Sequence, residues 1–155
     1  VAGTEIKMRS GLKSKFSTHL IKVACEVAVK KRDKLIINGD NYKTKDGTTI
    51  RDYIHISDLA EIHLLSLKDL IKNKKSHVFN CGYGKGYSVL DIVNLFKKMN
   101  KNTIVNYAKR RPGDVSQVYA DTKKSIKLLK WRPKYNNLKL ILKSAFKWEK
   151  KIKKS

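Results

Sequence analysis

Residues 39–60 read GDNYKTKDGTTIRDYIHISDLA. The Asp46-Gly47 pair is a favoured turn dipeptide, and the residues around it predict a polar loop. Apolar and polar residues then alternate, which predicts a strand over residues 50–56. Ser57 follows as a natural N-cap for a helix with a broad apolar side. A loop, a strand and a helix in close succession are typical of an α/β protein.

The predicted strand has two chemically different faces. Alternation places Arg51, Tyr53 and His55 on one side and three isoleucines on the other. One cation and two ring side chains are therefore expected to share a surface.

Helical and extended patterns also alternate in the rest of the chain. Apolar spacing and capping residues predict helices over residues 18–31, 57–73, from 88 onward, 121–131 and 137–150. Extended segments are predicted at residues 35–37, 50–56, 77–81, 103–108 and 117–120. Thr18 is the expected cap of the first helix, and Ser88 with Asp91 forms a capping-box pattern. This order predicts an α/β fold with a small mixed sheet and several helices.

The chain is strongly basic, with 36 Lys+Arg against 13 Asp+Glu and a formal net charge of +23. Such a balance raises nucleic acid as a partner. Only six of the cations are arginines, although arginine is the residue best suited to bidentate recognition of phosphate and guanine. The lysines are spread through every segment, so the pattern argues for a solvated surface and against a dedicated nucleic-acid patch.

Other classes of site find little support in the sequence. No apolar stretch reaches the 18 to 20 residues of a membrane span. Cys25 and Cys81 lack the spacing of a zinc site, so we expect no metal and a reducing compartment, the cytoplasm.

Two short motifs resemble catalytic signatures without their context. The glycines of residues 82–86 follow an extended segment and precede a helix, but their spacing is not GxGxxG, so we expect a structural turn. Tyr119 and Lys123 match YxxxK, a pattern that a lysine-rich chain produces by chance. We assign no catalytic residue and no cofactor-binding residue to this chain.

Several longer motifs carry a family resemblance. Residues 39–60 are joined by THLI at 18–21, FNCGYGKGYSV at 79–89, RRPGD at 110–114, ADTKKS at 120–125 and LKWRPKY at 129–135. Together they resemble the carboxy-terminal, substrate-binding half of the UDP-glucose 4-epimerases, members of the extended short-chain dehydrogenase group. The resemblance implies the carboxy-terminal part of a Rossmann-type fold, with residues 1–155 as the UDP-sugar-binding region.

The resemblance also implies a missing half. The chain opens at VAG of an expected NVAG, so we expect that the amino-terminal Rossmann domain is absent, with its TGxxGxxG loop and its Tyr-x-x-x-Lys pair. NAD would be bound by that half, and the intact enzyme is expected to be a homodimer formed through it. The chain alone is expected to be inactive.

The family pattern assigns a role to seven residues of this chain. His19 and Leu20 lie at a helix start expected to face the substrate diphosphate, where backbone N–H groups favour an anion. Arg51 and Arg111 are expected to bind the same diphosphate, and Asp114 the ribose. Further candidates are Asn38, which stands where the family often has an aromatic residue beside the uracil, and Tyr53, although a strand tyrosine often packs.

Neighbouring residues in an extended segment point to opposite sides, so Arg110 is expected to face away from the ligand and to contribute little. The implied substrates are UDP-glucose and UDP-galactose. Another NAD-dependent UDP-sugar epimerase, such as one for N-acetylated sugars, and a basic nucleic-acid-binding module stay open as alternatives.

Overall fold

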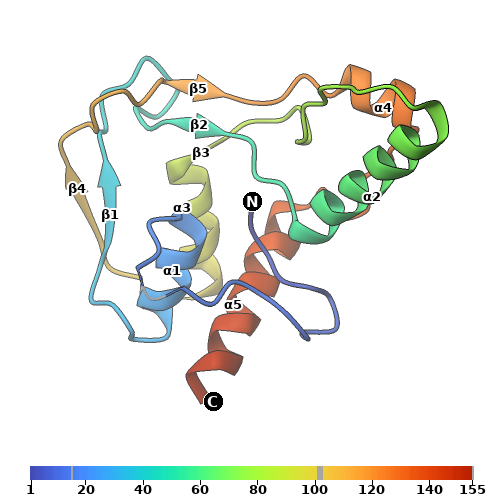
Figure 1. Ribbon diagram of the computed structural model, residues 1–155. Coiled ribbons are helices and arrows are strands. Elements are labelled where there is room, and N and C mark those ends of the chain that lie inside the picture. Colours follow the sequence, from blue (N-terminus) through green and yellow to red (C-terminus); the bar gives the residue numbers. More distant parts are fainter. Residues whose placement is uncertain (15, 101–102, 155) are drawn as a thin grey trace.

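Two small sheets and five helices form the part of the chain that the computed structural model describes, residues 1–14, 16–100 and 103–154 (Figure 1). The first sheet pairs β1 (Leu35–Asn38) in parallel with β4 (Val105–Ala108). In the second, β2 (Ile50–Arg51) lies between β3 (Tyr87–Ser88), antiparallel to it, and β5 (Gln117–Val118), parallel to it. The helices are α1 (Leu20–Ala28), α2 (Ile56–Asn73), α3 (Val89–Met99), α4 (Lys123–Leu129) and α5 (Leu138–Lys154). The predicted α/β class with a small mixed sheet is confirmed.

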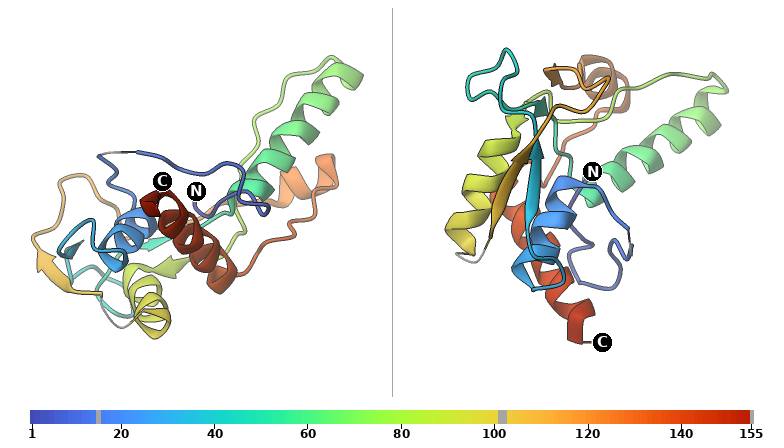
Figure 2. Two further views of the ribbon diagram at one scale, coloured as in Figure 1. Left: turned by 90° about the horizontal axis from the view of Figure 1, so that it is seen from below. Right: turned by 90° about the vertical axis from the view of Figure 1, so that its left-hand side faces the viewer.

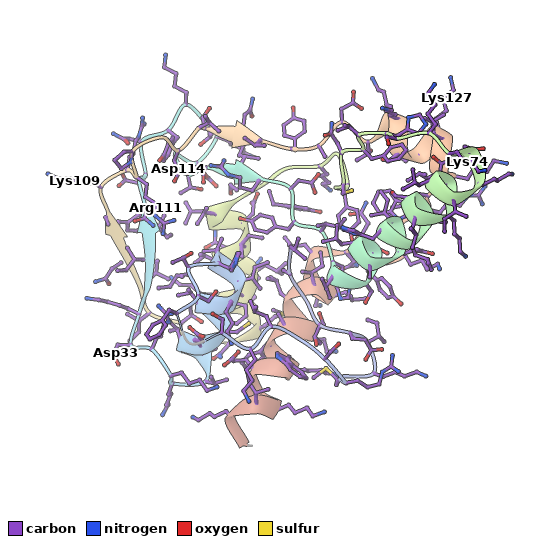
Figure 3. All side chains as sticks on the ribbon, viewed as in Figure 1. Asp33, Lys74, Lys109, Arg111, Asp114 and Lys127 are labelled. Atoms are coloured by element: carbon purple, nitrogen blue, oxygen red, sulfur yellow. The ribbon has the colours of Figure 1, made fainter. Side chains whose placement is uncertain are left out.

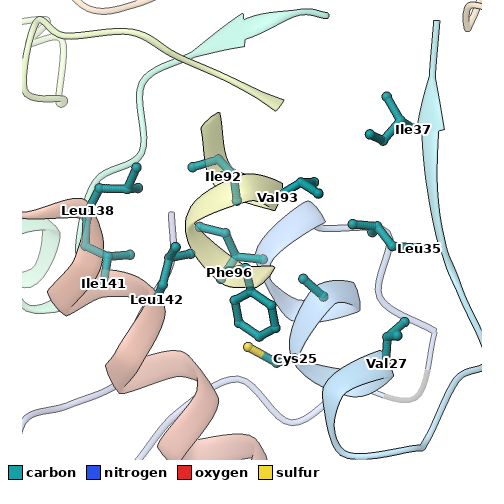
Figure 4. Packing of buried hydrophobic residues seen from close by; sticks show 12 residues of the cluster. Cys25, Val27, Leu35, Ile37, Ile92, Val93, Phe96, Leu138, Ile141 and Leu142 are labelled. Atoms are coloured by element: carbon teal, nitrogen blue, oxygen red, sulfur yellow. The ribbon is translucent and has the colours of Figure 1, made fainter. Parts of the chain in front are cut away.

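The main core lies between α1, α3, α5 and the inner face of β1 (Figure 4). Phe96 of α3 is fully buried at its centre, with Ala24 from α1 and Leu142 from α5. Full burial of one such large apolar side chain stabilises the fold by about 1.5–3 kcal/mol. A second, smaller cluster joins α2 to α4 through Ile62, Leu129 and Trp131. The apolar spacing of each helix therefore decides which face turns inward.

Helix α2 projects from the rest of the molecule in both views of Figure 2. Several of its apolar side chains stay in contact with solvent. Leu64 and Leu67 are each 52% exposed, and Ile71 is 67% exposed. Exposed apolar rows of this kind are typical of surfaces that contact another protein or domain.

Among α1, α2 and α3, the helix start follows the sequence in one case and differs in two. Ser88 and Asp91 form the predicted capping box at α3, each side chain bonding the other's backbone N–H. The cap of α1 is His19, one residue after the predicted Thr18. The cap of α2 is His55 rather than Ser57, because the His55 ring nitrogen Nδ1 accepts the N–H of Ser57 at 3.1 Å.

The strand predicted over residues 50–56 is shorter than expected. It ends at Arg51, because the Asp52 carboxylate turns aside to bind backbone N–H groups of another loop, and the chain beyond pairs with Ala2 instead of a sheet strand. His55 is fully buried, so the prediction that it shares a surface with Arg51 is wrong.

Residues 77–81, predicted as a strand, form none in the described chain. A strand needs a neighbour to complete its ladder of hydrogen bonds, and none of the described strands pairs with this segment. Val78 within it is 82% exposed. The sequence pattern is that of an extended segment, but none of the described strands lies beside it to form a sheet.

The buried His55 is held as the neutral imidazole. Nδ1 accepts from the Ser57 backbone, so the ring proton lies on Nε2, which is 3.3 Å from the Ser144 hydroxyl. The ring also packs against Tyr135, with centroids 4.8 Å apart. Burial lowers the pKa of His55 from its ordinary value of about 6.5, against a smaller opposing effect of Asp58.

Because the folded pKa of His55 is depressed, the unfolded chain binds the proton more readily. Stability should therefore be greatest above about pH 6.5 and should fall as the pH drops toward the folded pKa. Urea denaturation between pH 7.5 and pH 5 measures this. The pH dependence should shrink in His55→Gln and persist in His63→Gln, a change at an exposed histidine of α2. Equal pH dependence in all three proteins would contradict the assignment.

Candidate functional site

A cavity of about 290 Å³ opens between the start of α1, the strand β1 and the turn that follows β4. Four of the seven predicted site residues line it: Leu20, Asn38, Arg111 and Asp114. Figure 3 shows Arg111 beside β1, with Asp114 nearby. Three segments far apart in the sequence therefore meet at one hollow.

The Arg111 guanidinium is held at the wall of this cavity. With its amide oxygen turned toward Arg111, Asn38 accepts hydrogen bonds from Nη2 at 3.1 Å and from Nε at 3.2 Å. Asn38 ends β1, whose pairing with β4 brings the turn at Arg111 alongside. The paired strands thus set where this cation lies.

Arg51 reaches the same region from β2. Its Nη2 lies 3.5 Å from the Asp114 carboxylate, and its Nη1 donates to the Ile50 carbonyl at 2.8 Å. Both members of the ion pair are partly exposed, so water screens it and its own contribution to stability is small. Asp114 lines the cavity, and Arg51, which does not, lies beside it with its guanidinium partly exposed to a polar ligand.

The start of α1 adds backbone donors. No side chain within the described chain caps this helix, and its first turn holds no acidic residue. The first backbone N–H groups of a helix lack partners inside it, and the helix dipole favours an anion beside them. Leu20 lines the cavity at this point, so an anion there would meet N–H groups as well as guanidinium groups.

Two further cations line the cavity that the sequence motifs did not single out, Arg32 and Lys34. Arg32 donates to the Ser17 carbonyl at 2.9 Å and pairs with the buried Glu26, so it fastens the segment before α1 to the helix. The rarity of arginine in this chain was the signal that could have drawn attention to it.

His19 and Tyr53 lie elsewhere, in a second cavity of about 570 Å³ on the other side of Leu20. Tyr53 packs against the main core, and burial raises its pKa to about 12, so its hydroxyl stays protonated. The same cavity is bordered by Lys22 and Glu149, a buried ion pair that joins α1 to α5. Six of the seven predicted residues thus line two adjoining hollows, and Arg51 lies outside both, beside Asp114.

The glycine-rich loop at residues 82–86 serves the fold. The Asp52 carboxylate accepts from the backbone N–H groups of Tyr83, at 2.9–3.0 Å, and of Gly84, at 2.9 Å. A β-carbon on Gly82 would lie 2.4 Å from Asp52 Oδ2, so the close approach requires glycine there. Donors already used by a carboxylate are not free to hold a cofactor phosphate, as the irregular spacing of the glycines indicated.

Tyr119 and Lys123 do not lie one turn apart on the same helix, as the tyrosine and lysine of a catalytic YxxxK pair would. Tyr119 follows β5 and is 53% exposed, whereas Lys123 begins α4. Across the described ranges, no group of three or more His, Cys, Asp and Glu side chains is placed to hold a metal ion. No helix among those residues is both long and apolar enough to span a membrane.

Comparison with known proteins defines the family. The family model described as GDP-mannose 4,6 dehydratase matches residues 7–143, which is most of the chain. The chain therefore belongs to this family.

Individual relatives give a narrower match than the family model, to UDP-glucose 4-epimerases. The UDP-glucose 4-epimerase of Azospirillum brasilense is 42% identical over 156 residues, covering all of this chain and 45% of the relative. The solved UDP-Glc/GlcNAc 4-epimerase of Campylobacter jejuni is 47% identical with a TM-score of 0.77, and the match covers 97% of this chain and 46% of that one. The UDP-glucose-4-epimerase of Stenotrophomonas maltophila, solved with NAD and formylated UDP-arabinopyranose, has a TM-score of 0.92 at 28% identity and is covered to 46%. The resemblance to UDP-glucose 4-epimerases is confirmed, and the chain spans just under half the length of these relatives.

The structural role of Asp52 can be tested. Asp52→Asn leaves the Tyr83 and Gly84 N–H groups with a neutral acceptor, so unfolding should become about 1.5–3 kcal/mol easier. Urea denaturation measures the change, with the exposed Asp33→Asn as the matched control, expected within about 0.5 kcal/mol of the unchanged chain. Equal stability of the two variants would show that the loop does not depend on this carboxylate.

Proposed function

We propose that this chain is the nucleotide-sugar-binding, carboxy-terminal half of a UDP-sugar 4-epimerase that interconverts UDP-glucose and UDP-galactose. The observation that carries the proposal is the 290 Å³ cavity. Three features meet there: Arg111, which Asn38 holds; the Asp114 carboxylate; and the start of α1. The similarity to UDP-glucose 4-epimerases over the whole chain supports the same conclusion.

The residues that line the cavity, together with Arg51 beside it, each suit one part of a nucleoside diphosphate. Arg111 and Arg51 offer guanidinium forks, which match two neighbouring phosphates better than an ammonium does. The α1 start adds N–H donors to the same anion. The Asp114 carboxylate can accept from ribose hydroxyls, and Asn38 has an amide that can bond a pyrimidine edge.

Hydride transfer would be the task of the remainder of the protein. The sequence holds neither TGxxGxxG nor a YxxxK pair on one helix, and the glycine loop at residues 82–86 does not fit NAD because Asp52 takes its N–H groups. NAD would instead be bound by a Rossmann half, which would also form the homodimer. The exposed apolar row of α2 suits contact with such a partner domain.

The choice of sugar on the UDP substrate is a separate question. The relative from Campylobacter jejuni is a UDP-Glc/GlcNAc 4-epimerase and is 47% identical to this chain. We therefore include UDP-N-acetylglucosamine among the substrates to be tested. The two cysteines carry no disulfide, which suits a cytoplasmic enzyme.

The division of labour makes a direct prediction. The 155-residue chain should bind no NAD in calorimetric titration and should not convert UDP-galactose in a coupled assay, because the groups for both lie outside it. The full-length protein should do both. Turnover by the chain alone would falsify the proposal.

The arginines at the cavity lead to a second prediction, which concerns the full-length protein. Arg111→Ala or Arg51→Ala should each weaken UDP-sugar binding by about 1.5–3 kcal/mol, the value of a hydrogen bond to a charged group. Uridine, which has no phosphate, should bind almost unchanged. Calorimetric titration with uridine, UDP and UDP-glucose measures the contrast.

The exposed Arg132→Ala is the matched control, since it removes the same charge outside the cavity. Equal losses for uridine and UDP-glucose would contradict the diphosphate role. A nucleic-acid module would instead lose RNA affinity in small steps at many lysines, with a strong salt dependence.

A further inference from the structure

The two adjacent arginines of the turn after β4 have separate partners. Arg111 bonds Asn38 at the cavity wall, as described above. Arg110 extends over the loop that follows β1, where its Nε donates to the Asn41 side chain at 2.6 Å. Its guanidinium carbon lies 4.2 Å from the centre of the Tyr42 ring. The two side chains therefore contact the chain on either side of Gly39: Arg111 contacts Asn38, and Arg110 contacts residues 41 and 42.

The loop is shaped to receive Arg110. Tyr42 is 6% exposed, so its ring is a fixed platform rather than a mobile side chain. Gly39 has a φ of +84°, and a β-carbon there would lie 2.6 Å from Arg110 Cγ and 2.6 Å from the Tyr42 ring. Any other residue at this position would displace either the arginine or the tyrosine.

The turn itself has little burial to hold it. Residues 109–115 are all exposed, and within the turn the Asp114 N–H bonds the Arg111 carbonyl at 3.3 Å. An exposed turn loses conformational freedom when it binds a ligand, and a contact that orders it beforehand reduces that loss. A cation over an aromatic face contributes an attraction of this kind.

We infer that Arg110 is a positioning residue for the nucleotide-sugar site: clamped between Tyr42 and Asn41, it fixes the turn so that Arg111 and Asp114 face the cavity. This inference rests on the proposed function and adds to it a residue that touches no substrate. It replaces the expectation, drawn from the sequence, that Arg110 contributes little because it faces away.

The test is a double-mutant cycle in the full-length protein. Arg110→Ala should weaken UDP-glucose binding about three- to tenfold, the size of a cation–π contact. The loss should appear in KM, with kcat within about twofold of the unchanged enzyme, because only binding geometry changes. In the Arg111→Ala background the same change should cost clearly less than it does alone, since one of the two groups that Arg110 positions is already gone.

Two further variants separate positioning from general effects. Tyr42→Leu removes the clamp from the other side and should not add to Arg110→Ala. Lys109→Ala removes an exposed cation one residue away and should leave KM unchanged, which excludes a mere loss of positive charge. Thermal midpoints of Arg110→Ala and the unchanged protein should agree within a few degrees, because the removed side chain is exposed.

The outcomes are distinguishable. Losses from Arg110→Ala and Arg111→Ala that simply add, or no loss from Arg110→Ala, would overturn this inference and leave the proposed function intact. No loss from Arg111→Ala would overturn the proposed function, and this inference with it.

Discussion

Two carboxylates six residues apart, Asp52 and Asp58, bring distant segments of this chain together. Asp52 accepts backbone N–H groups from Tyr83 and Gly84, and more weakly from Ala120 at 3.4 Å. Asp58, fully buried at the start of α2, accepts those of Lys134 and Tyr135 at 2.9 Å. A buried carboxylate must be satisfied by donors, and Asp58 has two main-chain N–H groups and the Tyr83 hydroxyl, which donates at 2.6 Å.

The cavity proposed as the ligand site depends on this arrangement indirectly. Asp52 fixes the glycine loop that precedes β3 and also contacts Ala120, which follows β5, so β2 lies beside both strands. Arg51 then ends β2 within reach of Asp114. The other wall rests on a different pairing, that of β1 with β4, which sets Asn38 and Arg111 side by side. The site is thus formed where two small sheets meet the start of α1. Its cations lie on loops and strand ends, where a rigid scaffold can hold side chains out toward a ligand.

A positive surface alone would not distinguish this site from the rest of a chain with a net charge of +23. The distinction comes from constraint. Arg111 is held by an amide, Arg110 by a ring, and Arg32 by a backbone carbonyl, whereas most lysines extend into solvent. A planar guanidinium that is already oriented loses less freedom on binding than a flexible ammonium.

The sequence by itself determined the class of fold, the order of the elements other than β3, the capping box at Ser88 and the structural nature of the glycine loop, because each depends on local spacing and residue type. The family motifs also named four residues that line one cavity. Only the tertiary structure decided that the strand ends at Arg51, that His55 is a buried helix cap, and that residues 77–81 stay unpaired in the described chain. The same is true of the contact between Arg110 and Tyr42, 68 positions apart. Long-range partners override local alternation, because a carboxylate or a ring contacts the groups that the fold places beside it. The periodicity of the sequence does not reveal which groups those are.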